Sequence, residues 1–81
     1  MDGKAKYVVI NDGFGESAIV FDECFSHIRF KSLGKVVSAG FVEFDEEGAY
    51  CFGESITLKV KSREKEDANL INWRILRSLR L

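Results

Sequence analysis

Lys35–Phe44 has the sequence KVVSAGFVEF, and this run of β-branched and aromatic residues predicts a strand in the middle of the chain. Its side chains alternate between two faces, with Val37, Ala39 and Phe41 on one of them. The alternation slips near Gly40. Because glycine tolerates the backbone angles that a β-bulge requires, we expect a bulge at Gly40 within an otherwise regular strand.

A second strand is expected directly after this one. Residues 45–48 (DEEG) form a turn, and Ala49–Lys61 alternates over its whole length. One parity holds the apolar side chains Tyr50, Phe52, Ile56, Leu58 and Val60, and the other holds Cys51, Gly53, Ser55, Thr57, Lys59 and Lys61. An antiparallel strand with one buried and one solvated face has this pattern. We therefore expect Tyr50 and Phe52 to be buried.

The end of the chain predicts an amphipathic helix that begins after Ser62. Acidic residues precede basic ones along it, an order that complements the helix dipole. Apolar residues recur on one side at helical spacing, at Ala68, Ile71, Ile75, Leu76 and Leu79. We expect Ser62 to cap a long helix that packs across one face of the sheet.

Another group of side chains lies outside this apolar side of the predicted helix. The group comprises Leu70, Trp73, Arg74, Arg77 and Leu81, with Arg80 beside it. Tryptophan and arginine are enriched at the energetic centres of protein interfaces. These five residues are our candidate binding site for a protein partner or for a second copy of the chain, in the simplest case a homodimer.

A hairpin is expected on the N-terminal side. Lys6–Ile10 and Ala18–Phe21 have the composition of short strands. The connection between them contains the turn sequence NDG at residues 11–13 and is longer than two residues. The two strands therefore pair through a loop rather than a tight turn.

The segment between this hairpin and the central strand is ambiguous. Asp22–Leu33 fits both helical spacing and strand alternation. We favour a short helix, with Asp22 or Ser26 as its N-cap and Gly34 at its end. The chain then forms one α+β domain, residues 1–81, with the order ββαββα: an antiparallel sheet of about four strands, with a long C-terminal helix packed on one face.

The tetrapeptide FGES occurs twice, as Phe14–Ser17 and as Phe52–Ser55. A duplicated ββα unit leaves such a repeat, but here the flanking residues align poorly and the turn sequences differ. We interpret the repeat as a glycine step that suits two strands. Glu16 and Glu54 are expected to be solvated glutamates rather than a catalytic pair.

Three side chains have the chemistry of soft-metal ligands: Cys24, His27 and Cys51. A structural zinc site takes four ligands, so this set is incomplete. Cys24 and His27 are spaced to meet on a helix, but a nucleophilic pair also needs an orienting group and a substrate pocket, for which an 81-residue chain leaves little room. We expect no metal, no cofactor and no enzymatic activity.

Charge is unevenly distributed along the chain. The net charge of -1 argues against non-specific binding to nucleic acid. However, Val36–Leu58 holds five acids and no Lys or Arg, whereas Lys59–Leu81 holds seven basic residues and three acids. The basic C-terminal region leaves single-stranded nucleic-acid binding as the alternative function, in which Tyr50 and Phe52 would stack on bases only if they were exposed.

The sequence also predicts where the protein resides. The apolar run near the start is too short for a signal peptide, and no stretch approaches the ~18 apolar residues of a membrane span. Two cysteines do not make a disulfide framework. We expect a cytoplasmic protein with reduced thiols that acts as a small non-enzymatic binding or adaptor domain.

Overall fold

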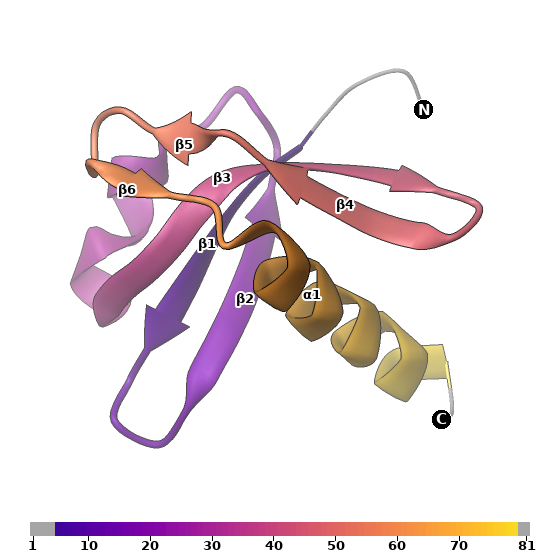
Figure 1. Ribbon diagram of the computed structural model, residues 1–81. Coiled ribbons are helices and arrows are strands. Elements are labelled where there is room, and N and C mark those ends of the chain that lie inside the picture. Colours follow the sequence, from indigo (N-terminus) through magenta and orange to yellow (C-terminus); the bar gives the residue numbers. More distant parts are fainter. Residues whose placement is uncertain (1–4, 80–81) are drawn as a thin grey trace.

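The computed structural model describes the backbone of residues 5–79 and the side chains of residues 5–73. Its main element is a four-stranded antiparallel sheet with the spatial order β2-β1-β3-β4 (Figure 1). The strands are β1 (Ala5–Asn11), β2 (Glu16–Phe21), β3 (Lys35–Asp45) and β4 (Gly48–Phe52). The other elements are the 3₁₀ helix η1 (His27–Leu33), the short paired strands β5 (Glu54–Ser55) and β6 (Val60–Lys61), and the helix α1 (Glu64–Leu79). The α+β class and the antiparallel sheet are therefore confirmed.

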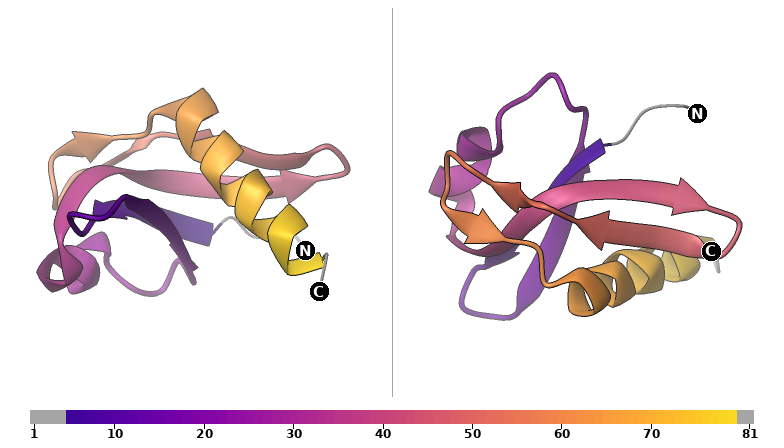
Figure 2. Two further views of the ribbon diagram at one scale, coloured as in Figure 1. Left: turned by 90° about the horizontal axis from the view of Figure 1, so that it is seen from below. Right: turned by 45° about the horizontal axis from the view of Figure 1, so that its top comes forward.

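Strand β1 is central because both of its faces are covered. Tyr7, Val8 and Val9 have no exposed surface, and Ile10 is nearly as buried. Tyr7 and Val9 pack with α1, whereas Val8 and Ile10 pack with η1 on the other side of the sheet (Figure 2). We call these two sides the α1 face and the η1 face. The continuous apolar run of β1 reflects burial on both of them.

Each face of the sheet has its own small hydrophobic cluster. The cluster on the α1 face consists of Tyr7, Val9, Ala18, Val42, Cys51 and Ile71, with Ala68 and Leu70 of α1 partly buried against it. The cluster on the η1 face consists of Val8, Ile10 and Ala39, with Phe30, Leu58 and Val60 partly buried against it. Because both clusters are thin, the fold depends on the elements that cover them.

Asp67 lies in α1 and is completely buried between the helix and the sheet. Its carboxylate accepts hydrogen bonds from the Tyr7 hydroxyl, from the Ser38 hydroxyl at 2.9 Å and from the backbone N–H of Arg63 at 2.8 Å. The Arg63 guanidinium adds an ion pair at 3.0 Å. A buried carboxylate is costly unless its oxygens are satisfied, and both oxygens of Asp67 have donors here.

Ser62 does not have the expected capping role. Its hydroxyl contacts the Tyr7 hydroxyl, which has one proton and gives it to the stronger acceptor, Asp67. Ser62 therefore donates to Tyr7, and the Asp67 carboxylate caps the start of α1 through the Arg63 N–H. Burial, and then the hydrogen bond to Asp67, raise the pKa of Tyr7 far above its ordinary value.

Arg63 extends this network to the hairpin formed by β1 and β2. Two of its guanidinium nitrogens bind the two carboxylate oxygens of Glu16, at 2.8 and 3.2 Å. The pair is partly exposed, with 28% of the Arg63 side chain and 33% of the Glu16 side chain accessible. Solvent screening therefore keeps its contribution to stability small.

The expected single strand Ala49–Lys61 is wrong, because the structure divides it into β4, β5 and β6. Gly53 follows β4 with a φ of +79°, which a residue with a side chain adopts only with strain. Ser55 then closes a turn, because its Oγ accepts the Leu58 N–H at 3.2 Å. The chain folds back beside β3 instead of continuing as one strand (Figure 1).

The burial expected for this segment is only partly confirmed: Phe52, Leu58 and Val60 are partly buried and Thr57, Lys59 and Lys61 are exposed, but other positions are inverted. Tyr50 and Ile56 are 58% and 83% exposed, whereas Cys51 and Ser55 are 2% and 1% exposed. The reason for Cys51 is that α1 packs on the parity that carries it. Tyr50 has the other parity and lies on the η1 face, at a part of β4 beyond the cluster there.

The expected bulge is also misplaced. Val9 faces Ser38 and Ile10 faces Val36, so Val37 is the extra residue in β3. Gly40 instead marks a close approach of two backbones, since a Cβ there would lie 2.5 Å from the Phe52 carbonyl oxygen. Tertiary packing, not strand irregularity, requires glycine at this position.

The predicted order ββαββα needs correction as well. The segment after β2 is a 3₁₀ helix, capped by Ser26 through the Ile28 N–H at 3.4 Å, and β5 and β6 add two short strands. The prediction of a long helix across one face is also corrected. The helix packing that the structure describes is confined to the short stretch Glu64–Trp73, chiefly against β4 and less against β2. The Asn72 amide oxygen accepts the Ala49 N–H of β4 at 2.8 Å.

Asp67→Ala should lower the free energy of unfolding by about 3–5 kcal/mol, because it leaves buried donors of Tyr7, Ser38 and Arg63 without an acceptor. Glu16→Gln is the matched control and should cost less than about 1 kcal/mol, because its ion pair is partly exposed. Urea denaturation followed by circular dichroism measures both. Similar losses for the two variants would contradict the central role of Asp67.

Candidate functional site

Six rings follow one another across the η1 face. Their order is Phe30, Phe21, His27, Phe41, Phe52 and Tyr50, and neighbouring centroids are 4.4 to 5.9 Å apart. The last three rings come from β3 and β4, where Phe41 lies opposite Phe52 in the ladder. Their planes differ by only 26° and 32°, so Phe41 and Phe52 stack and Tyr50 is tilted against Phe52, and we call this row of three rings the aromatic shelf. Tyr50, at its end, is exposed.

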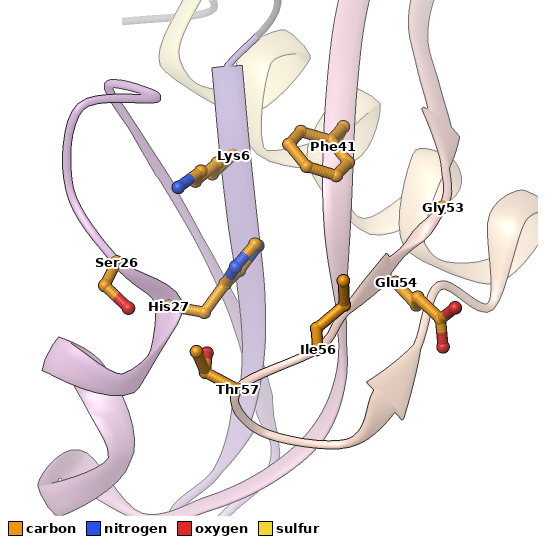
Figure 3. A pocket seen from close by; sticks show the side chains of 8 residues that line it. All are labelled: Lys6, Ser26, His27, Phe41, Gly53, Glu54, Ile56 and Thr57. Atoms are coloured by element: carbon orange, nitrogen blue, oxygen red, sulfur yellow. The ribbon is translucent and has the colours of Figure 1, made fainter.

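A hollow of about 430 Å³ adjoins this shelf. It is lined by Lys6, Ser26, His27, Phe41, Gly53, Glu54, Ile56 and Thr57 (Figure 3). Segments far apart in the sequence enclose it, since Lys6 belongs to β1, His27 to η1 and Ile56 to the turn between β5 and β6. The Glu54 carboxylate points away from the hollow, and the Ile56 side chain points into it (Figure 3).

Two further features shape the walls of the hollow. The Lys6 ammonium donates to the Phe25 carbonyl at 2.8 Å, which directs its charge toward the loop before η1. Gly53 touches the Phe41 ring, since a Cβ at this position would lie 3.0 Å from that ring. The positive φ of Gly53 and this close contact together hold β4 and β5 at the rim.

His27 is the polar group at the base of the hollow and is 5% exposed. Its Nε2 lies 2.8 Å from the Gly40 carbonyl oxygen, so this nitrogen carries the proton and donates. Its ring makes edge contacts with Phe21 and Phe41. Burial lowers the pKa of His27, although the hydrogen bond to Gly40 opposes the shift. The imidazole is therefore neutral at pH 7.

Acidic side chains flank the exposed end of the shelf. Glu43 lies directly opposite Tyr50 in the ladder and is exposed. Asp45, Glu46 and Glu47, in the turn between β3 and β4, are exposed as well. The β3–β4 hairpin thus combines aromatic and acidic groups, and from Val36 to the end of β4 it contains no Lys or Arg.

The residues predicted from the sequence as a partner site are only partly brought together. Trp73 is 60% exposed, as a binding residue should be. Leu70 is partly buried against the α1-face cluster and so contributes to the fold. The side chains of Arg74, Arg77 and Leu81 lie outside the described residues. The sequence did not reveal the shelf or the hollow, because they depend on η1 and β5–β6 meeting over β1 and β3.

The candidate metal ligands are not gathered into one site. Cys51 is buried on the α1 face, His27 is buried on the η1 face, and Cys24 is exposed in the loop before η1. Among residues 5–73, no group of three or more His, Cys, Asp or Glu side chains is arranged to hold a metal ion.

The two FGES copies occupy unlike environments. Phe14 is completely exposed at the tip of the β1–β2 hairpin, whereas Phe52 ends β4 and stacks on another ring. Glu16 pairs with an arginine near the start of α1, and Glu54 borders the hollow on the other side of the sheet. The repeat therefore does not form a single site.

The comparisons with known proteins add no relative. No family model matches the chain, and neither the curated proteins nor the solved structures gave a match. No helix in the described part of the chain is long and apolar enough to cross a membrane.

Stability should fall as the pH drops below about 6.5, because His27 has a lowered pKa in the folded state and protonates more readily when unfolded. The slope for this one proton is at most about 1.4 kcal/mol per pH unit. Urea midpoints measured from about pH 7.5 to about pH 5.5 test this, with His27→Gln as the control that should flatten the dependence. An identical slope in the variant would show that another group is responsible.

The two cysteines should differ sharply in reactivity. Burial, with a further contribution from the charge of Asp67, raises the pKa of Cys51 to about 11, so its thiol is protonated as well as covered. Cys24 is exposed. A thiol reagent should label Cys24 in the native protein and Cys51 only after unfolding, as mass spectrometry of the two sites would show. Equal labelling of both would contradict the packing of α1 over Cys51.

Proposed function

We propose that this protein is a small, non-enzymatic binding domain that docks a protein partner, or a second copy of itself, through the outer side of α1. The observation that carries the proposal is the 60% exposure of Trp73 on a helix whose inner side is already buried by Ile71 and Asp67. An exposed tryptophan is costly in water and is a frequent centre of interface energy.

The polar groups best suited to catalysis support a binding role rather than an enzymatic one. Asp67, Ser38 and Tyr7 are completely buried and bonded to one another, so a substrate does not reach them. They stabilise α1 against the sheet. The proposal places the domain in the cytoplasm, where both thiols stay reduced.

The interface is expected to include Arg74, Arg77 and Leu81 as well as Trp73. In the sequence, Arg77 follows Trp73 by four residues and Leu81 by eight, the spacing of one side of a helix, and Arg74 is the next residue. Leu81 lies outside the described residues. Leu70 is a weaker member, because part of its surface is already packed inside the protein. Self-association in this form gives a homodimer with Trp73 near the symmetry axis.

Single-stranded nucleic-acid binding is the second candidate, and one observation favours it. Tyr50 is exposed, as base stacking requires, whereas the neighbouring Phe52 is only partly exposed. Glu43 lies directly opposite Tyr50, however, and its charge repels a phosphate backbone. We rank this function second for that reason. It predicts a gel shift that is lost in a variant with Arg74, Arg77 and Arg80 changed to Glu.

Trp73→Ala should weaken assembly without unfolding the domain, because the side chain is largely outside the core. Trp73 is the only tryptophan, so the fluorescence of the protein reports on this side chain alone. As the protein concentration rises, the mass measured by light scattering should increase. The emission should shift to shorter wavelength in parallel, because assembly buries the ring. Phe14→Ala is the matched control, since Phe14 is fully exposed in the loop between β1 and β2.

A heterologous partner is tested by placing a photo-crosslinking residue at position 73 or, as the control, at position 14 in cells. Specific adducts at position 73, identified by mass spectrometry, support the proposal. The proposed docking function would be refuted by two results together. The mass would stay that of a monomer at every protein concentration, and positions 73 and 14 would give the same adducts or none.

A further inference from the structure

The shelf and the hollow form one continuous surface on the η1 face, away from α1. It runs from the exposed Tyr50 and Glu43, across Phe52 and Phe41, into the hollow at His27 and Ile56. We call this surface the Tyr50 strip. Its rings are held in place by the ladder between β3 and β4, so it does not need to rearrange to receive a ligand.

Among the described residues, the charged side chains at the exposed end of the Tyr50 strip are acidic. Glu43 stands beside the Tyr50 ring, and the turn that follows adds Asp45, Glu46 and Glu47. The ion pairs among the described side chains all involve Arg63, on the other side of the molecule, so none of these carboxylates is neutralised within that part of the chain. Among residues 5–73, the cation that lines the hollow is Lys6, which is bonded to the Phe25 carbonyl on the η1 side.

Aromatic faces beside carboxylates attract cations. A Lys ammonium or an Arg guanidinium binds over an aromatic ring through the ring's quadrupole, and a nearby carboxylate adds a charge-assisted hydrogen bond. The guanidinium of Arg also stacks on single aromatic rings. The hollow at the other end of the strip has Phe41, Ile56 and a neutral His27 in its walls, and so favours an apolar side chain.

We propose that the Tyr50 strip binds a basic, extended segment of a partner protein, with a Lys or Arg side chain over Tyr50 and Phe52 beside Glu43, and an apolar side chain in the hollow. This surface is separate from the Trp73 side of α1. The domain then has two docking surfaces on opposite sides of its sheet, as an adaptor requires.

The test is a titration of the full chain, labelled with ¹⁵N, with a short synthetic peptide of alternating Arg and Leu residues. Amide shifts should concentrate in Phe41–Phe52 and around Ile56. The same peptide with Glu in place of Arg should not bind. Affinity should fall as salt rises from about 50 mM to about 500 mM, because the screening length shortens.

Matched variants separate local recognition from overall charge. Glu43→Gln with Glu47→Gln should weaken peptide binding about tenfold, whereas Glu64→Gln with Glu66→Gln removes the same charge from α1 and should change it less than twofold. Tyr50→Ala should weaken binding about fivefold. The amide spectrum of each variant reports that it is folded, so a loss of binding is not confused with unfolding.

Several results would overturn the inference. Equal weakening by both double variants, or shifts centred on α1, would show non-specific attraction. An oligothymidine that shifts the same amides with greater affinity would make the strip a nucleic-acid platform. A further contrary result would be that the protein has the mass of a dimer, and the double variant Glu43→Gln with Glu47→Gln the mass of a monomer. That result would assign the Tyr50 strip to contact between two copies of the chain. Trp73→Ala should leave peptide binding unchanged, so this inference and the proposed function fail separately.

Discussion

The carboxylate of Asp67 fixes the position of α1, and most of the structure follows from that position. It binds a hydroxyl from β1, a hydroxyl from β3 and the backbone at the start of the helix. A charge in this place is unfavourable unless all of these donors are aligned, so the helix has one well-defined way to dock. Burial of a charged group in so small a core therefore gives specificity of arrangement, while the hydrophobic clusters on the two faces supply most of the favourable free energy.

The docking of α1 also explains where the functional surfaces lie. With the helix on the side of Cys51, the opposite side of the β3–β4 hairpin keeps Tyr50 exposed and leaves Phe41 and Phe52 partly exposed. The 3₁₀ helix and the β5–β6 turn then meet beside Phe41 and enclose the hollow. The docking of α1 also leaves Trp73 on the outer side of the helix. The docking of α1 on one side of the sheet thus produces two surfaces of different chemistry. One presents an exposed tryptophan, and the other is aromatic and acidic.

Sequence reasoning succeeded where local signals and burial agree. The β1–β2 hairpin, the strand Lys35–Phe44, the cap at Ser26 and the terminal helix all formed where composition and turn residues predicted them. It failed in Ala49–Lys61, where strict alternation was taken to mean one strand with its large side chains inside. Gly53 indicated a break in this strand, since an isolated glycine in a strand often marks a bend. Nothing in the alternation itself showed that the helix would cover the parity with the smaller side chains.

The sequence by itself determined the class of the fold, the number of main strands and the helix that follows them, because these depend on periodicity and on turn residues that act over a few positions. It also determined that an acidic segment precedes a basic one. Only the tertiary structure decided which face of each strand is buried, that Ser62 joins Asp67 in a buried network instead of capping the helix, and that Tyr50, Phe41 and Ile56 share one surface. Those outcomes depend on contacts between residues far apart in the chain, and the free energy of such contacts is set by which surfaces remain available once α1 has docked.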